Sequence, residues 1–90
     1  MLETTAMVTV SLHYWAGAKA AAGVDEEAVE AASVAAALEV ARGRRKDLRF
    51  ERVLAVSSIL VDGQLVRTED LDATLTQPVR VEILPPFAGG

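Results

Sequence analysis

The sequence predicts one α+β domain in which a mixed sheet of four or five strands packs on one main helix. Three observations support this fold class. A chain of 90 residues fits one domain with one small core. A helix-type apolar stripe lies in the middle of the chain, and short segments with strand-type alternation lie on both sides of it. Because one helix stripe has to be buried against one sheet face, the expected architecture has two layers.

The first strand is predicted to begin at residue 8. Apolar side chains alternate there with polar ones, and this period of two is typical of a strand with one buried face. The apolar positions are Val8, Val10, Leu12 and Tyr14. His13 falls on the polar face, and we expect it to face solvent because no second titrating partner accompanies it. Residues 1–6 show no period and are expected to be a disordered extension of a domain that spans residues 7–84.

Two weaker elements are predicted next. Residues 15–23 contain two glycines and many alanines, which suit a wide turn or a short helical turn. Residues 24–32 predict a second strand, and its acidic side chains favour a place at the solvated edge of the sheet. Successive strand residues point to opposite faces, so these carboxylates are not expected to converge on a metal ion. They are Asp25, Glu26, Glu27 and Glu30.

The main helix is predicted over residues 34–46. Ser33 is a suitable N-cap, and the apolar stripe follows the spacing i, i+3, i+4, i+7. The stripe consists of Val34, Ala37, Leu38 and Ala41. Six of the nine basic residues lie between Arg42 and Arg52. This run is either a docking patch for an acidic partner or a helix C-terminus with a solvated loop, and we favour the second because charge runs are usually solvent faces.

A hairpin is predicted in the last third of the chain. Its first strand covers residues 57–61, and Asp62-Gly63 joins this strand to residues 64–66. This dipeptide is a strong hairpin signal because a type I′ turn needs positive φ at both central positions. Residues 68–70 are expected to form a capped turn under the sheet.

The final strand is predicted to follow Pro78 and to end at Pro85-Pro86. One of its faces carries Val79, Val81 and Ile83, and the other carries Arg80, Glu82 and Leu84. The resulting order is β–β–α–β–β–β, in which a right-handed crossover lets the last strand lie parallel beside the first. This is the ubiquitin-like β-grasp arrangement, whereas a ferredoxin-like arrangement needs two helices and the sequence predicts one.

Composition narrows the possible functions. The net charge of −4 argues against a general nucleic-acid binder, whose binding face is basic. Without cysteine there is no disulfide, no thiolate zinc site and no thiol nucleophile, and one histidine cannot form a multi-histidine metal site. No apolar run approaches the roughly 20 residues that cross a bilayer. We therefore expect a cytoplasmic protein without a metal, catalytic residues or a membrane partner.

The most distinctive feature is the segment PPFAGG at residues 85–90. Two prolines favour a stiff, extended chain, and two glycines let a backbone enter a narrow channel. Six extended residues span about 20 Å, so the segment can carry a terminal carboxylate into a pocket of another protein. The segment expected to enter that pocket is Pro85, Pro86, Phe87, Ala88 and Gly89, and the residue expected to react is Gly90.

A carboxylate at Gly90 becomes an electrophile once a separate ATP-using enzyme converts it to an acyl-adenylate. Attack by a sulfur donor then gives a thiocarboxylate, and attack by a lysine gives an isopeptide. A frayed Gly-Gly end is the simpler interpretation. We favour the reactive one because the glycine pair stands at the end of the sequence, follows a strand and a Pro-Pro pair, and belongs to a β-grasp pattern.

These features together resemble the MoaD/ThiS family of ubiquitin-like sulfur carriers, and within it the small subunits of molybdopterin synthase. The resemblance covers Met7 to Gly90 and is most specific in PPFAGG. Supporting stretches are VTVSLHYWAGAKAAAG, SVAAALEVA and ERVLAVSSILVDGQLV. One departure is Lys19-Ala20, where the family commonly has Arg-Glu after the first strand.

The resemblance implies a non-catalytic sulfur carrier. Gly90 would be adenylated by a ubiquitin-activating-type adenylyltransferase that uses ATP, and a sulfur donor protein would convert it to a thiocarboxylate. The tail would then enter the large subunit of molybdopterin synthase, which supplies the catalytic residues. There, sulfur would pass to a cyclic pterin monophosphate during molybdenum cofactor synthesis. No cofactor bound by the chain itself, no nucleic acid and no membrane is implied.

Two alternatives share this terminal chemistry. One is a sulfur carrier for thiamine, cysteine or tRNA thiolation, and the other is a ubiquitin-like modifier conjugated to lysines through Gly90. A plain interaction module with an inert tail is the least favoured interpretation. Leu60, Leu84 and Phe87 are candidates for an exposed apolar partner face, although a core position fits Leu60 and Leu84 equally well.

Overall fold

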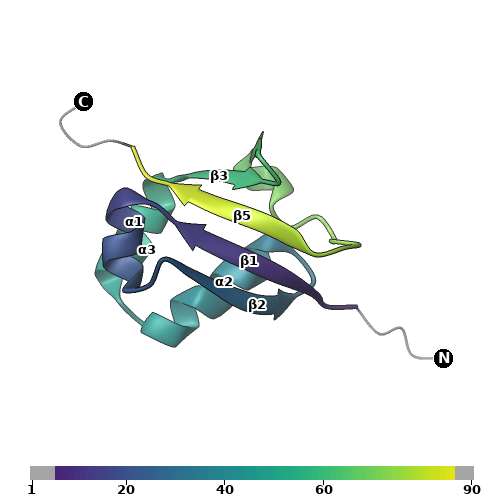
Figure 1. Ribbon diagram of the computed structural model, residues 1–90, viewed down its shortest axis with the longest axis horizontal. Helices are drawn as coiled ribbons and strands as arrows, with labels where there is room; N and C mark the ends of the chain where they lie inside the picture. Colours follow the sequence, from purple (N-terminus) through teal and green to yellow (C-terminus); the bar gives the residue numbers. More distant parts are fainter. Residues whose placement is uncertain (1–5, 87–90) are drawn as a thin grey trace.

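A mixed five-stranded sheet with helices packed against one face forms the molecule, as the computed structural model of residues 6–86 shows (Figure 1). The strands are β1 (Val8–Tyr14), β2 (Glu26–Ala31), β3 (Ser58–Val61), β4 (Gln64–Val66) and β5 (Val79–Leu84). The helices are α1 (Ala16–Ala22), α2 (Val34–Arg45) and α3 (Leu48–Val56), with a 3₁₀ turn η1 (Thr68–Asp70). The predicted α+β class is confirmed.

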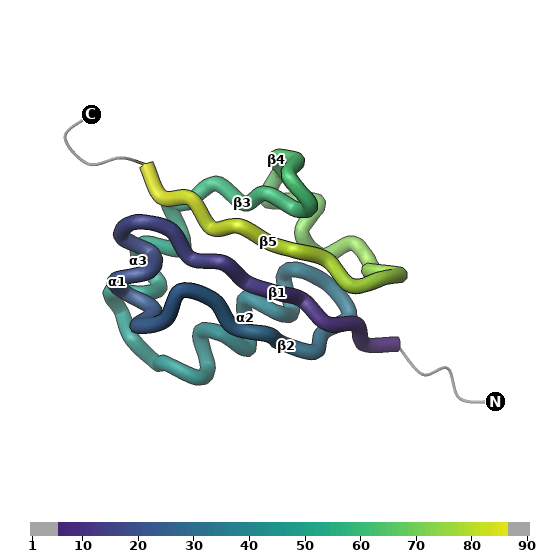
Figure 2. Tube along the Cα trace, in the orientation of Figure 1, coloured from purple at the N-terminus to yellow at the C-terminus, as the bar shows by residue number. Residues whose placement is uncertain are grey.

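The strand order is β2-β1-β5-β3-β4, so the last strand of the chain lies in the middle of the sheet (Figure 2). β5 runs parallel to β1, and the remaining neighbours are antiparallel. Tyr14 of β1 and Ile59 of β3 both pair with Ile83, one from each side. The predicted closure of the last strand beside the first is therefore confirmed, as is the edge position of β2.

Alternate strand residues face the helices and form an apolar core. In β1 and β5 they are Val10, Leu12, Tyr14, Val79, Val81 and Ile83. The largest fully buried side chain is Phe50 of α3, and no charged side chain among the described residues is fully buried. Burial of one such apolar side chain contributes about 1.5–3 kcal/mol, so the period-two pattern accounts for the packing of the two layers.

The helix α2 forms as the sequence predicts. Ser33 caps its first turn, because the Ser33 hydroxyl accepts a hydrogen bond from the backbone N–H of Ala36 at 3.0 Å. All four residues of the predicted apolar stripe are buried. The helix ends at Arg45, one residue earlier than predicted, and Lys46 follows with a left-handed φ of 49°.

The structure contains two further helices, of which α1 takes the helical one of its two expected forms and α3 was not predicted. α1 turns twice where a wide turn or a short helical turn was expected, and α3 occupies the segment expected to be a solvated loop. Asp47 caps α3 by accepting a hydrogen bond from the backbone N–H of Arg49 at 2.8 Å. Phe50 and Leu54, one turn apart, are its buried residues. The loop prediction for this segment was wrong because two buried apolar residues among several charged ones give too weak a helical pattern to be seen in the sequence.

The predicted hairpin turn is present between β3 and β4. Asp62 has a φ of 49° and Gly63 a φ of 85°, which is the positive pair that a type I′ turn requires. Asp62 also ties the turn to β5: its side chain accepts from the Arg80 N–H at 2.9 Å, and its own N–H donates to the Arg80 carbonyl at 2.8 Å. Among the helices of residues 6–86, none has the length and apolar character needed to cross a membrane.

Candidate functional site

The end of β5 is the base from which the predicted reactive tail departs. On one side Leu84 pairs with Ser58 of β3. On the other side the backbone N–H of Trp15 donates to the carbonyl of Ile83 at 3.2 Å. Pro85 is half-buried and Pro86 is exposed. The tail therefore starts from a strand end that hydrogen bonds and pairing fix on both sides.

The structure describes only the first two residues of the predicted tail. Phe87, Ala88 and Gly89, which were predicted to enter a partner's pocket, lie outside the described residues. Gly90, the residue predicted to react, lies outside them as well. Their roles stay predictions.

An apolar patch lies on the face of the sheet that points away from the helices. Leu84 alternates with the buried Ile83 and so faces outward from β5, and Leu60 does the same in β3 beside the buried Ile59. Both side chains are half-buried. They therefore belong to the predicted outer apolar face and not to the core between the layers.

The sequence interpretation missed a third member of this patch, Leu65. It stands directly opposite Leu60 in the hairpin and is 72% exposed. The signal was available, because a two-residue turn at Asp62-Gly63 fixes the register and places these two leucines on the same face. The outer apolar patch of the structure thus consists of Leu60, Leu65 and Leu84.

A hollow of about 420 Å³ opens beside the base of the tail. It is lined by His13, Tyr14, Trp15, Ala16, Lys19 and Asp25. Two of these residues, Lys19 and Asp25, form an ion pair of 2.9 Å. Trp15, whose backbone N–H is hydrogen-bonded to β5, also lines the hollow and is 46% exposed. An aromatic surface with polar groups around it is therefore available next to Leu84.

His13 does not face solvent in the way the sequence suggested. Its side chain is on the outer face of the sheet, but only 16% of it is exposed. The Nε2 atom lies 3.9 Å from a carboxylate oxygen of Glu26, its cross-strand partner. The expectation of a solvent-facing histidine was wrong because His13 lies in a central strand, between its cross-strand neighbours Glu26 and Glu82.

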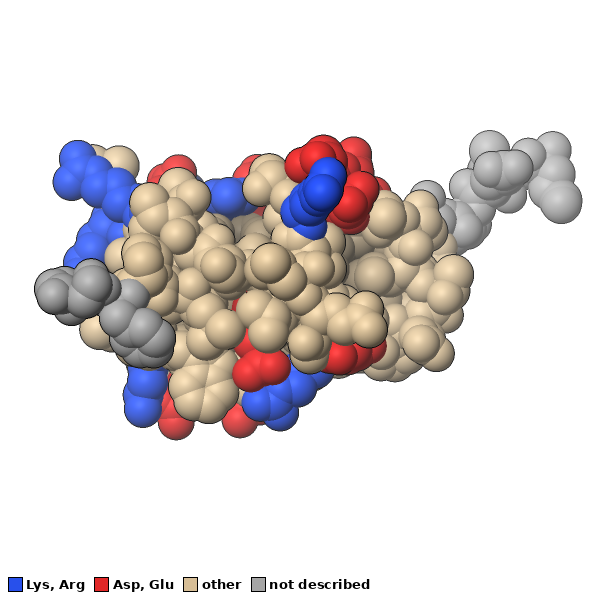
Figure 3. Space-filling model, turned by 90° about the horizontal axis from the view of Figure 1, so that it is seen from above, with Lys and Arg blue, Asp and Glu red and all other residues tan. Residues whose placement is uncertain are grey.

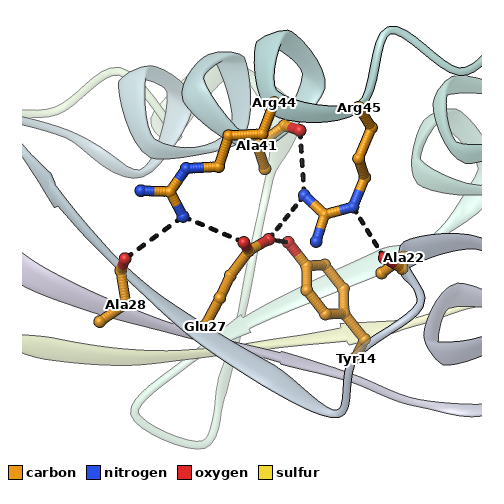
Figure 4. A network of polar contacts seen from close by, with 7 residues as sticks. All are labelled: Tyr14, Ala22, Glu27, Ala28, Ala41, Arg44 and Arg45. Atoms are coloured by element: carbon orange, nitrogen blue, oxygen red, sulfur yellow. Dashed lines mark hydrogen bonds and ion pairs between the residues drawn. The ribbon is translucent and has the colours of Figure 1, made fainter.

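Beneath the hollow, a polar network joins α2 to the first two strands (Figure 4). The Glu27 carboxylate accepts a hydrogen bond from the Tyr14 hydroxyl. It also pairs with Arg44 at 3.0 Å and with Arg45 at 2.8 Å. Arg45 further donates to the carbonyls of Ala22 and Ala41, both at 3.0 Å. One carboxylate thus connects β1, β2 and the end of α2.

The location of Glu27 corrects a prediction. The acids of β2 were expected to be solvated, yet the Glu27 side chain is only 14% exposed. It pairs in register with Leu12, so it points toward the helices. Two arginines of the predicted basic run meet it: Arg45 lies inward with 13% of its side chain exposed, and Arg44 reaches it from the surface with 48% exposed. Two other members of that run, Arg49 and Arg52, are exposed on α3.

The network shifts the acidity of two groups. Burial, together with the hydrogen bond to Glu27 and its charge, raises the pKa of the Tyr14 phenol well above its usual value. Burial alone would raise the pKa of Glu27, but hydrogen bonds from Tyr14, Arg45 and Arg44 outweigh it and lower that pKa. Tyr14 is therefore a stable hydrogen-bond donor and Glu27 a stable anion at neutral pH. Neither is free to act as a general acid or base.

Within residues 6–86, no three metal-ligating side chains gather closely enough to hold an ion. The arrangement at this end of the molecule offers a fixed tail base, an apolar outer patch and an aromatic hollow. Exposed apolar groups that lie close together are typical of interaction surfaces.

Residues 12–90 match the model of the ThiS family. Among solved structures, the chain is similar to a putative molybdopterin converting factor subunit 1 from Pyrococcus furiosus, with 28% identity and a TM-score of 0.71. That alignment covers 89% of this chain and 99% of the other. A comparison with curated protein sequences gives no match.

Two further solved structures share the fold. Small archaeal modifier protein 1 from Methanosarcina acetivorans has 23% identity and a TM-score of 0.77, with 93% of this chain and 98% of the other covered. A complex of subunits 1 and 2 of molybdopterin-converting factor from Helicobacter pylori contains a chain with 18% identity and a TM-score of 0.64. It covers 91% of this chain and 99% of the other.

Proposed function

Since this chain belongs to the ThiS family, we propose that it is a sulfur carrier whose Gly90 carboxylate is adenylated and then thiocarboxylated. We further propose that its sulfur is used in molybdopterin synthesis. One observation carries the proposal: the family match continues through PPFAGG to Gly90, so the predicted tail belongs to the matched region.

The fold supports this role by fixing where the tail begins. β5 is held between β1 and β3. Near the end of β5, the carbonyl of Ile83 accepts a hydrogen bond from the backbone N–H of Trp15. Pro85 and Pro86 then restrict the chain to an extended course. A tail with a fixed origin and a limited set of directions loses less conformational entropy when a partner's channel takes it up.

The proposed chemistry needs no catalytic group on this chain. A carboxylate oxygen of Gly90 attacks the α-phosphorus of ATP and releases pyrophosphate, which leaves an acyl-adenylate. A sulfur donor that delivers hydrosulfide then attacks the acyl carbon, the bond to AMP breaks, and a thiocarboxylate remains. The adenylating enzyme binds the nucleotide, and the present chain supplies the carboxylate.

We propose a second partner, the large subunit of a molybdopterin synthase. The Helicobacter pylori structure is a complex of subunits 1 and 2 of molybdopterin-converting factor, which supports a subunit of this kind as the partner. In this chain, the outer apolar patch of Leu60, Leu65 and Leu84 adjoins the base of the tail. A partner that covers the patch and accepts the tail would bury one continuous surface.

The direct test is intact-mass spectrometry of the chain incubated with its host's adenylating enzyme, ATP and a sulfur donor. The mass is expected to rise by the difference between a sulfur and an oxygen atom. A variant without Gly90 is the matched control and should keep its mass and its fold. An unchanged mass of the full chain would contradict the carrier function.

The alternative of a protein modifier has a specific observation in its favour, the structural similarity to small archaeal modifier protein 1. In that case the adenylate is attacked by a lysine amine, and an isopeptide replaces the thiocarboxylate. Adding the thiocarboxylated chain to the large synthase subunit and the cyclic pterin monophosphate separates the alternatives. Formation of a dithiolene product supports the molybdopterin role. Conjugates to lysines would support the protein modifier instead. Sulfur found only in thiamine, cysteine or tRNA products would support a carrier for one of those pathways.

A further inference from the structure

The helix α3 has an exposed side that the fold does not use. Its inner side buries Phe50 and Leu54. Residues at i, i+1, i+4, i+7 and i+8 of the helix share the opposite side. These residues, called the α3 stripe, are Leu48, Arg49, Arg52, Ala55 and Val56, and all are exposed.

The stripe combines apolar side chains with unpaired cations. Leu48 is 61% and Val56 is 62% exposed, so two large apolar groups stand in solvent on one short helix. Within residues 6–86, neither the Arg49 nor the Arg52 guanidinium makes an ion pair or a hydrogen bond. Arg45, by contrast, is fully engaged with Glu27 and backbone carbonyls.

The position of Arg49 works against the helix itself. It lies in the first turn of α3, where the positive end of the helix dipole disfavours a cation. Asp47 caps this turn, but its side chain accepts from the backbone N–H of Arg49 and makes no ion pair with the Arg49 guanidinium. The helix therefore gains nothing from the charge at this place, and a role outside the fold explains it better.

The stripe lies at the end of the molecule from which the tail departs. α3 ends at Val56, and Ser58, two residues later, pairs with Leu84 immediately before Pro85. Figure 1 shows α3 at the same end of the sheet as the tip of β5. Figure 3 shows Lys and Arg side chains at that end of the molecule, as well as others near its middle. A partner that binds the chain at Leu84 and Pro85 would therefore lie close to α3.

The charge of the stripe is opposite to that of the whole chain. With a net charge of −4, the protein as a whole is repelled by an acidic surface. A local basic stripe beside the tail would instead attract such a surface and orient the chain tail-first. The apolar side chains at its two ends supply area that becomes buried on contact.

We infer that the α3 stripe docks on an acidic surface with apolar contacts on the enzyme that adenylates Gly90. This inference rests on the proposed function. It commits to the adenylating enzyme because both the sulfur carrier and the protein modifier need that step, whichever acceptor follows. Arg49 and Arg52 pair with carboxylates of the enzyme, while Leu48 and Val56 are buried at the edges of the contact.

The experiment measures adenylation of Gly90 by the host's adenylating enzyme, as ATP–pyrophosphate exchange at varied concentrations of the chain. The variants are Arg49→Glu and Arg52→Glu, and Arg67→Glu is the matched control with the same change in net charge. Arg67 is exposed and lies near η1. The KM for the chain is expected to rise about tenfold in each α3 variant, with kcat retained and Arg67→Glu near the wild type.

Thermal unfolding separates docking from folding. Arg49→Glu places an anion in the first turn of α3, so its melting temperature should equal or exceed that of the wild type while its KM rises. Arg52→Gln serves as a milder variant that keeps the fold. For the wild type, KM should also increase with ionic strength, and this dependence should be weaker in both arginine variants.

The outcomes distinguish the two proposals. If the wild-type chain is not adenylated at all, the proposed function fails and the inference with it. If the wild type is adenylated and the α3 variants keep its KM, only the inference is overturned. Sedimentation of the wild type, but not the variants, with phosphatidylserine vesicles would assign the stripe to a membrane surface instead and would also overturn it.

Discussion

Tyr14 and Phe50 meet edge to face, with ring centroids 5.7 Å apart and planes inclined by 77°. The guanidinium of Arg45 lies over both rings, 5.4 Å from the first centroid and 4.8 Å from the second. The aromatic pair connects β1 to α3, and Arg45 adds the end of α2 to the same contact. Three elements that are distant in the sequence are therefore held together directly below the hollow at the base of the tail.

Phe50→Ala should lower the free energy of unfolding by about 3–5 kcal/mol, because the ring is 1% exposed and its removal leaves a cavity beside Tyr14. Urea denaturation followed by circular dichroism measures the change. Val56→Ala, on the exposed side of the same helix, is the control and should change stability by less than about 0.5 kcal/mol. Equal effects of the two substitutions would show that α3 is not anchored through this ring.

Acid should destabilise the protein through Glu27. Its pKa in the folded chain lies below the ordinary value of 4.5, so its stabilising contribution is complete above that value and is lost as pH falls through the folded pKa. Unfolding measured from pH 7 down to strongly acidic pH should show this loss. Glu27→Gln should be less stable at pH 7 by about 1–3 kcal/mol and should show a smaller decline in acid. If the stability of the wild type and of Glu27→Gln declined equally with falling pH, Glu27 would not be the group responsible.

Gly63→Ala should destabilise the hairpin by about 1 kcal/mol, because a side chain is strained at a φ of 85° although no neighbouring atom lies within 4 Å. Gly43 has equally open surroundings but lies inside α2. Gly43→Ala should therefore stabilise by about 0.5–1 kcal/mol. The two melting temperatures should move in opposite directions, and a shift in the same direction would show that backbone conformation is not the cause.

Leu65→Ser should weaken binding to the large synthase subunit by about 1–3 kcal/mol while leaving thermal stability nearly unchanged, because the side chain is 72% exposed. Calorimetric titration measures the affinity. Thr74→Ala, also at an exposed position but in the loop before β5, is a control that should bind like the wild type. Normal affinity of the Leu65 variant would remove the outer apolar patch from the proposed interface.

Gly89→Val tests access of the tail to a partner's channel. A β-branched side chain restricts the backbone and widens the segment that has to pass through the channel. Adenylation or sulfur transfer is expected to fall sharply, with little change in melting temperature. A large drop in melting temperature with normal transfer would mean that Gly89 serves the fold instead.

The difference between α2 and α3 shows what local patterns can predict. α2 has a cap at Ser33 and four apolar residues in register, and both signals lie within a few positions of each other. α3 buries mainly Phe50 and Leu54, and arginines on either side resemble a solvated run. The helix forms because the core accepts that pair, which is tertiary information that the segment itself does not contain.

Of the candidate site, too, only the parts with a local sequence pattern could be predicted. The prolines and the strand before them follow from residue type and period, whereas the outward position of Leu84 was one of two alternatives that the sequence left open. The inward role of Glu27 does not, because its partners Arg44 and Arg45 come from another element and only the packed structure brings them within 3 Å. The hollow beside Trp15 likewise depends on how several side chains pack together.

The central position of β5 also constrains the order of events during protein synthesis. It is the last of these five strands in the chain, yet it separates β1 from β3, so without it the sheet consists of two unconnected hairpin-like pairs, β1–β2 and β3–β4. A nascent chain that stops before Val79 therefore cannot close its sheet. Chains that stop before the strand next to the tail keep an open sheet, and they therefore remain exposed to proteolysis.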